Sequence, residues 1–163
     1  MLKELSAKLK SDPEHLLQRV ESLEQELKSS KSDLDKLKAK MAKEEMGELS
    51  AETVNGCSVI IKELQGVDRN DLRTLGDSLK DKYENAFVLL ISVEDGKPVL
   101  MATASDGAVK KGAHAGNLIK EVAAVLGGGG GGKPQMAQAG GKDVSAIPHA
   151  LEKAKELMQA QLQ

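Results

Sequence analysis

Two glycine-rich segments with attached lysines are the residues of this sequence best suited to bind a ligand. Residues 127–132 are six consecutive glycines followed by Lys133, and a second glycine pair at 140–141 precedes Lys142. Because glycine has no Cβ, an anion or a sugar can approach the main chain closely, and successive N–H groups can turn toward an anion as a concave nest. The pattern predicts an anion-binding loop in which Lys133 and Lys142 supply the positive charge.

The charge distribution supports this prediction. Residues 106–142 carry five lysines and two acidic residues, although the whole chain, with 23 basic and 25 acidic residues, has a net charge of −2. A local positive excess is the footprint of an anion site, whereas the near-neutral whole excludes a polybasic coat. We expect a folded RNA read through its backbone, since Tyr83 and Phe87 are the only aromatic residues on which bases could stack. The candidate contacts are Lys110, Lys111, His114, Lys120, Gly127, Gly128, Gly129, Gly130, Gly131, Gly132, Lys133 and Lys142.

Other kinds of site do not fit these residues. The glycine run satisfies most of the G-x-x-x-x-G-K-[ST] phosphate loop, but Pro134 stands at the Ser/Thr position and a helix is expected before it. A dinucleotide-binding G-x-G-x-x-G matches only trivially, because no acidic residue ends a second strand at the required distance. The three histidines have no second ligand at metal spacing, and Cys57 has no base near it in sequence. We therefore expect no metal, and a buried, unreactive Cys57.

The first part of the chain has the pattern of a coiled coil, with Ser30 as the only polar residue in an apolar seam. In a parallel dimer the flanking residues would pair with opposite charge: Arg19 with Glu24, Glu26 with Lys31, and Asp33 with Lys38. The short amphipathic helix expected at residues 2–9 cannot cover so long a seam. The partner is then a second protomer, or a helix that precedes this chain in a longer protein. The seam residues, at steps of four and three, are Leu16, Val20, Leu23, Leu27, Leu34, Leu37 and Met41.

A compact α/β pattern follows a break at residues 46–51, which divides the chain into segments 1–46 and 47–163. We expect strands at 54–64, 86–93, 98–103 and 135–139, and helices at 69–83, 114–126 and 145–162. Asp95-Gly96 predicts a hairpin turn, and Pro98, which lacks an N–H group, indicates an edge strand after it. The fold class is an α/β globular domain with a small mixed sheet and flanking helices, preceded by a long coiled-coil-like helix.

The segment GGGGGGKPxMAQAGGKD at residues 127–143 resembles the glycine-rich signature in the C-terminal part of alanyl-tRNA synthetases. That likeness extends over the whole chain, because a leucine-repeat helix precedes the globular domain in those proteins as well. The resemblance implies a homodimeric, cytoplasmic module that binds tRNA-Ala and positions it for aminoacylation and editing. It also implies that ATP and zinc belong to other domains and that no catalytic residue or cofactor lies in this chain.

The globular fold of that family is shared with DHH-family phosphoesterases, which gives the alternative. There the related module would clamp a nucleic-acid or dinucleotide substrate against a metal-dependent catalytic domain. Two features weigh against it: Lys133-Pro134 stands where those enzymes typically have a histidine, and they usually lack leucine heptads upstream.

Composition and patterning yield three further expectations. A single cysteine excludes an internal disulfide and fits a reducing compartment, and no apolar stretch approaches the length of a membrane span. Replacing Gly129 or Gly130 with valine should reduce RNA binding far more than folding. Placing lysine at Leu23, Leu27 and Leu34 should produce monomers.

Overall fold

The structure is a computed structural model that describes residues 2–47 and 51–163; for residues 2, 35 and 38–47 it describes the backbone alone. Contacts divide the chain into two compact units, Met1–Met41 and Ala42–Gln163. The boundary expected from composition, between residues 46 and 47, lies at the end of a long helix and stays a prediction. The break expected at residues 46–51 lies partly outside the described residues.

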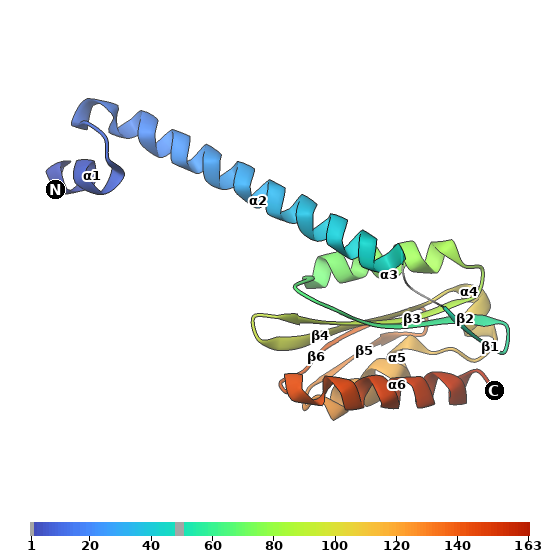
Figure 1. Cartoon of the computed structure of the whole chain (residues 1–163). Helices are drawn as coiled ribbons and strands as arrows, with labels where there is room; N and C mark the ends of the chain where they lie inside the picture. Colours follow the sequence, from blue (N-terminus) through green and yellow to red (C-terminus); the bar gives the residue numbers. More distant parts are fainter. Residues whose placement is uncertain (1, 48–50) are drawn as a thin grey trace. The chain divides into compact units, whose positions relative to one another are not determined.

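The N-terminal unit contains the short helix and most of the long helix that the sequence predicts (Figure 1). Helix α1 (Leu2–Leu9) is followed by a 3₁₀ turn, η1 (Pro13–His15), with Asp12 at its N-cap and proline in its first turn. Helix α2 (Leu16–Gly47) then continues without interruption.

The apolar seam of α2 is largely open to solvent in the single chain. Val20, Leu27, Leu34 and Leu37 are 40%, 72%, 58% and 58% exposed, whereas Leu16 and Leu23 are half-buried. Met41 lies in the helix, and its side chain is outside the described part. A long helix is therefore confirmed, while its pairing as a coiled coil stays a prediction.

The second unit is a six-stranded mixed sheet with helices on both faces (Figure 1). The strand order is β1-β2-β3-β4-β6-β5, and every neighbouring pair is antiparallel except β2 and β3, which are parallel. The predicted fold class is thus confirmed. The elements are β1 (Glu52–Val54), β2 (Cys57–Leu64), α3 (Arg69–Lys82), β3 (Ala86–Glu94), β4 (Lys97–Ala104), α4 (Asp106–Lys110), α5 (Ala115–Val125), β5 (Gly129–Lys133), β6 (Met136–Gly140), η2 (Val144–Ala146) and α6 (Ile147–Gln161).

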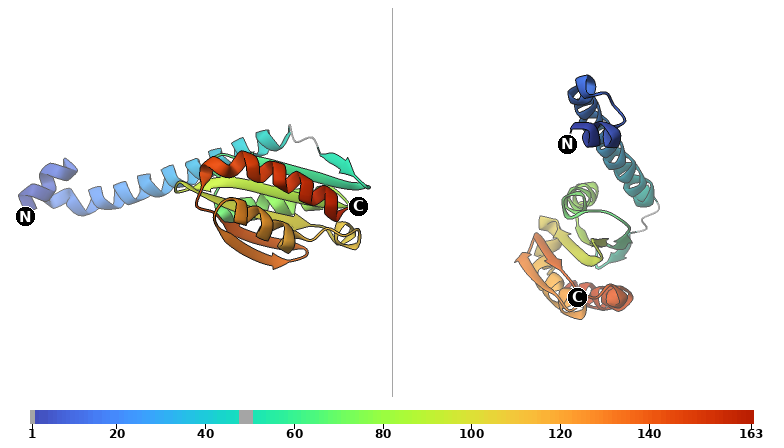
Figure 2. Two further views of the ribbon diagram at one scale, coloured as in Figure 1. Left: turned by 90° about the horizontal axis from the view of Figure 1, so that it is seen from below. Right: turned by 90° about the vertical axis from the view of Figure 1, so that its left-hand side faces the viewer.

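Each face of the sheet has its own apolar core. Helix α3 packs on β3 and β4 on one face, over side chains such as Ile60, Leu90 and Met101. Helices α5 and α6 cover the other face, α5 over β4, β5 and β6 and α6 over β2 and β3, with Phe87 and Leu118 among the buried residues (Figure 2). Strand β3 is buried on both faces, as its continuous apolar sequence predicts.

Local signals place the helix ends well. The Asp68 carboxylate accepts the N–H of Asp71 at 2.9 Å and so caps α3, as expected. Gly127 has φ +65° directly after α5, the left-handed conformation that ends a helix at C′. The final helix and the strand expected at residues 135–139 are also present, as α6 and β6.

The structure corrects two strand predictions. Residues 54–64 are not one strand, because Asn55 and Gly56 have φ of +50° and +76° and form a turn between β1 and β2. Strand β4 is not an edge, since it pairs with β3 and β6. Pro98 is tolerated because the ladder with β6 begins only at Val99; Pro98 contributes its carbonyl, which accepts the N–H of Gly141 at 2.8 Å.

The prediction of a concave nest in the glycine run is also wrong. Residues 129–133 are extended and form β5, which pairs with β6 across a two-residue turn, Pro134-Gln135. Polyglycine has little tendency to form a strand by itself. The hydrogen-bonding partner that the tight turn brings alongside it is therefore what holds it extended.

Candidate functional site

The glycine run lies in a β5–β6 hairpin at one edge of the sheet, and its turn is tied to the rest of the domain (Figure 2). The hydroxyl of Thr103 donates to the carbonyl of Gln135 at 3.0 Å, and the N–H of Ala104 donates to the same carbonyl at 2.9 Å. The N–H of Ala115 donates to the Pro134 carbonyl at 2.9 Å. The hairpin turn is thus fixed both to β4 and to the start of α5.

Helix α5 supports the hairpin along its whole length. At the far end the Leu126 carbonyl accepts the N–H groups of Lys142 and Asp143 at 2.8 and 3.1 Å. In between, Gly116 packs so closely that a Cβ there would collide with the Gly132 carbonyl. The edge strand is therefore held on a rigid support, although all five of its residues are exposed.

The glycines of the run fall into two alternating sets. A Cβ on Gly128, Gly130 or Gly132, here called the packed glycines, would collide with the backbone of residues 136–141. Nothing in the described structure lies within 4 Å of a Cβ placed on Gly129 or Gly131, the open glycines. The packed glycines are explained by the fold, whereas local packing gives no reason for the open ones.

The open glycines face the side of the sheet that carries α3. Gly129 pairs with Gly140 and Gly131 with Gln138, and directly opposite residues of an antiparallel pair share a face. The Gln138 side chain contacts Met101 of the α3-side core at 3.7 Å. Helix α3 covers β3 and β4, and among the described residues of this unit no helix packs on the same face of β6 and β5.

A cation that the sequence analysis missed lies on this face. Arg69, at the start of α3, has a guanidinium nitrogen 3.7 Å from where a Cβ of Gly140 would be. Its side chain is exposed, and neither Arg69 nor Arg73 forms an ion pair within the described part of the chain. The spacing of arginines on a predicted helix was available in the sequence, but only the sheet order shows that this helix flanks the hairpin.

The predicted lysines do not gather into one cluster. Lys133 and Lys142 lie at opposite ends of the hairpin, whose five-residue strands are each about 17 Å long. The Lys111 ammonium donates to the carbonyls of Asn55 and Gly56, both at 3.3 Å, near the opposite edge of the sheet. Lys110 and Lys120 are exposed on α4 and α5.

His114 caps α5 next to the hairpin turn. Its ring Nδ1 accepts the backbone N–H of Asn117 at 3.1 Å. The backbone N–H of His114 donates to the side-chain oxygen of Gln161 at 2.8 Å. A ring that accepts at Nδ1 carries its proton on Nε2. The remaining Nε2–H of His114 is then the group that can donate to a ligand.

The other sequence candidates hold no site. Cys57 is fully buried, and burial raises the pKa of its thiol against the opposing effect of Lys111, so the thiol stays protonated at neutral pH. Among the described residues no three His, Cys, Asp or Glu side chains come together at metal-binding distance. No helix in the same part of the chain is apolar over a length that could cross a bilayer.

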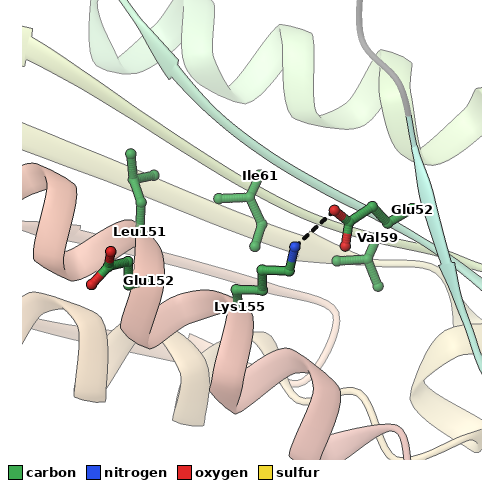
Figure 3. A pocket seen from close by; sticks show the side chains of 6 residues that line it. All are labelled: Glu52, Val59, Ile61, Leu151, Glu152 and Lys155. Atoms are coloured by element: carbon green, nitrogen blue, oxygen red, sulfur yellow. Dashed lines mark hydrogen bonds and ion pairs between the residues drawn. The ribbon is translucent and has the colours of Figure 1, made fainter.

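A cavity of about 360 Å³ lies at the other edge of the sheet, between β1, β2 and α6 (Figure 3). Val59, Ile61 and Leu151 form its apolar walls. The Lys155 ammonium, its only lining cation, is paired with Glu52 at 2.8 Å. With Glu152 also present, this cavity is unsuited to an anion.

Comparison with known proteins identifies the class. Residues 56–160 match the DHHA1 domain. The chain therefore belongs to the DHHA1 domain family. It is similar in particular to the C-terminal region of alanyl-tRNA synthetases, as the glycine-rich signature predicts.

Two curated relatives illustrate this similarity. Alanine–tRNA ligase 1 of Lachnoclostridium phytofermentans is 46% identical over 163 residues, which cover 99% of this chain and 18% of that protein. The alanine–tRNA ligase of Bacillus anthracis is 41% identical over 162 residues, which cover 98% and 18%. The chain thus spans less than a fifth of the length of these relatives.

Solved structures agree with this assignment. The C-Ala domain of Aquifex aeolicus alanyl-tRNA synthetase superposes with a TM-score of 0.62 at 30% identity, over 68% of this chain and 99% of that one. A DHH-domain protein described as a member of the s1p family of ribosomal proteins gives a TM-score of 0.58 at 17% identity, over 90% of this chain and 35% of that one. The second likeness shows a shared fold alone.

Proposed function

We propose that this chain is the C-terminal tRNA-binding and dimerisation module of an alanyl-tRNA synthetase. It holds tRNA-Ala for aminoacylation and editing by domains that lie outside this chain. The observation that carries the proposal is the 46% identity to an alanine–tRNA ligase over 99% of the chain. The match to 99% of the C-Ala domain supports it from the structural side.

The module acts by binding and performs no chemistry of its own. A tRNA held at one part of its surface is restricted to a small volume, which raises the effective concentration of its acceptor end at the active sites. Residues of this chain supply neither an ATP site nor a zinc site in this proposal, and both cofactors belong to the other domains. Dimerisation through α2 adds a second point of attachment.

The tRNA is recognised through its folded shape and backbone. Of the two aromatic side chains, Phe87 is fully buried and Tyr83 is half-buried, with the Lys82 ammonium 5.7 Å from its ring centroid. Proteins that read single strands rely on several exposed aromatic rings for base stacking. The globular domain instead offers the open edge strand β5 and exposed cations, which suit a sugar–phosphate backbone.

Fluorescence anisotropy with the whole 163-residue chain tests the proposal. The probes are unmodified tRNA-Ala, a second tRNA and a short single-stranded RNA, each titrated between about 50 and 200 mM salt. We expect salt-sensitive binding of both folded tRNAs and little binding of the single strand. Preference for the single strand would favour the phosphoesterase substrate module instead, and failure to bind any of the three would refute the proposal.

A further inference from the structure

We propose that the RNA backbone lies in a trough between α3 and the open face of the β5–β6 hairpin, held by Arg69, Arg73 and Lys80. This inference rests on the proposed tRNA binding and names the surface that performs it. The trough has the three cations along one side and the open glycines, Gln138 and Gly140 as its floor. It lies on the face of the sheet opposite to α5, the helix that carries the exposed Lys120.

The three cations form one row along α3. The helix buries Leu72, Gly76 and Leu79 on the sheet. Residues spaced by four and seven, as Arg69, Arg73 and Lys80 are, lie on the same flank of a helix, beside the buried stripe. Over eleven residues this row is about 16 Å long.

The row faces the hairpin at both of its ends. At one end the Arg69 guanidinium lies beside Gly140, the last residue of β6. At the other end Lys80 lines a hollow of about 330 Å³ together with Gln135, which belongs to the hairpin turn. The row therefore runs beside the whole of β6, whose five residues span about 17 Å.

The charge of the trough suits phosphates. Arg69 and Arg73 are exposed and make no ion pair among the described residues, and guanidinium groups bind phosphate oxygens through paired N–H donors. The Lys80 ammonium lies 3.6 Å from the Asp77 carboxylate, whose negative charge partly offsets the positive charge of the lysine. Asp81, Glu84 and Asp106 line the hollow near the turn, so the net positive charge is concentrated toward Arg69.

The floor of the trough allows close approach. Side chains at Gly129 and Gly131 would stand up from the sheet on this face, where the structure leaves empty space. Their absence keeps the edge of the sheet flat and lets a ribose or a phosphate reach the main chain. This need for access explains glycine at the two positions that packing leaves unexplained.

The test compares two variants of the whole chain that each lose two positive charges. Arg69→Gln/Arg73→Gln removes cations from the trough, and Lys110→Gln/Lys120→Gln removes the rival contacts on α4 and α5 that the sequence predicts and the trough does not use. Lys111 is left intact because it holds the turn between β1 and β2. All four positions are exposed, so both variants should melt at the temperature of the unchanged chain.

We expect Arg69→Gln/Arg73→Gln to bind tRNA at least tenfold more weakly, with the slope of log K against log salt about two units shallower. The matched Lys110→Gln/Lys120→Gln variant should retain affinity within about threefold. An equal or larger loss in the lysine variant, or an unchanged slope in the arginine variant, would overturn the trough and leave tRNA binding standing. Absence of tRNA binding by the unchanged chain would refute the proposed function itself.

Discussion

Gly130 and Gly131 are neighbours in the sequence, but they are glycine for different reasons. At Gly130 a Cβ would collide with Ala139 and with the Gln138 carbonyl, whereas at Gly131 the space is empty. The expectation that Gly130→Val would spare the fold is therefore wrong. The same expectation for Gly129 stays a prediction and extends to Gly131.

Alanine substitutions at Gly130 and Gly131 should have opposite effects on stability. Gly131→Ala should raise the free energy of unfolding by about 0.4–1 kcal/mol, because alanine restricts the unfolded chain and meets no neighbour in the fold. Gly130→Ala should lower it by about 1–3 kcal/mol through overpacking against β6. Urea denaturation of the two variants measures the difference, and equal effects would contradict the division into packed and open glycines.

Valine at Gly131 should weaken tRNA binding without weakening the fold. Gly131→Val fills the floor of the trough while leaving the core untouched, so tRNA affinity should fall about tenfold with little loss of stability. Anisotropy titrations and thermal melts on one preparation measure both quantities. Unchanged affinity in a folded Gly131→Val protein would remove the open glycines from the binding surface.

Of two hairpin turns that an Asp-Gly or Asn-Gly pair marks in the sequence, only one is predicted. Asp95-Gly96 predicts a hairpin turn, and in the structure Asp95 and Gly96 have φ of +50° and +74°. Asn55-Gly56 is the same kind of signal with nearly the same φ values, but it lies inside an apolar run that resembles one continuous strand. Periodicity alone does not show a turn that short.

At the scale of elements, sheet order decides which residues meet. Helix boundaries were predictable because caps are local: Asp68 begins α3 and Gly127 follows α5. The cations of the trough were not, because the sequence does not state that β6 lies between β4 and β5. The sequence groups the lysines on α4 and α5 only by closeness in the chain, although α5 covers the face of the sheet opposite to α3.

Packing of α5 on β5 gives a prediction at this scale. Alanine is normally about 1 kcal/mol better than glycine inside a helix, but at Gly116 a Cβ would meet the Gly132 carbonyl. Gly116→Ala should therefore lower the free energy of unfolding by about 1–3 kcal/mol despite the gain in helix propensity. Glu121→Ala, at an exposed position of the same helix, serves as the control and should change it by less than about 0.5 kcal/mol. A stabilised Gly116→Ala protein would contradict the close contact.

At the scale of the whole molecule, the exposed seam of α2 is the feature that a single chain leaves unsatisfied. Full burial of a leucine side chain contributes about 1.5–3 kcal/mol, and Leu27 and Leu34 are mostly exposed here. The sequence predicts the seam and the charges beside it. It does not state whether the covering helix belongs to a second copy or to another part of a longer protein.

A pair of charge insertions distinguishes these partners. Leu27→Lys/Leu34→Lys places cations in the seam and should convert a dimer to a monomer. Gln25→Lys/Ser32→Lys adds the same charge at exposed positions outside the seam and should leave the dimer intact. Sedimentation velocity reports the mass. A seam variant that remains dimeric would place the interface elsewhere, and an unchanged chain that is already monomeric would assign the seam to another helix.

The most direct test of the account is a titration of the ¹⁵N-labelled chain with tRNA-Ala followed by NMR, because it locates the RNA without any substitution. We predict that the amide signals of Gly129, Gly131 and Gly140 and the side-chain N–H of Arg69 shift or broaden first, while those of Lys110 and Lys120 stay in place. Changes confined to α4 and the outer face of α5 would contradict the trough. A spectrum that tRNA leaves unaltered would contradict tRNA binding by this chain.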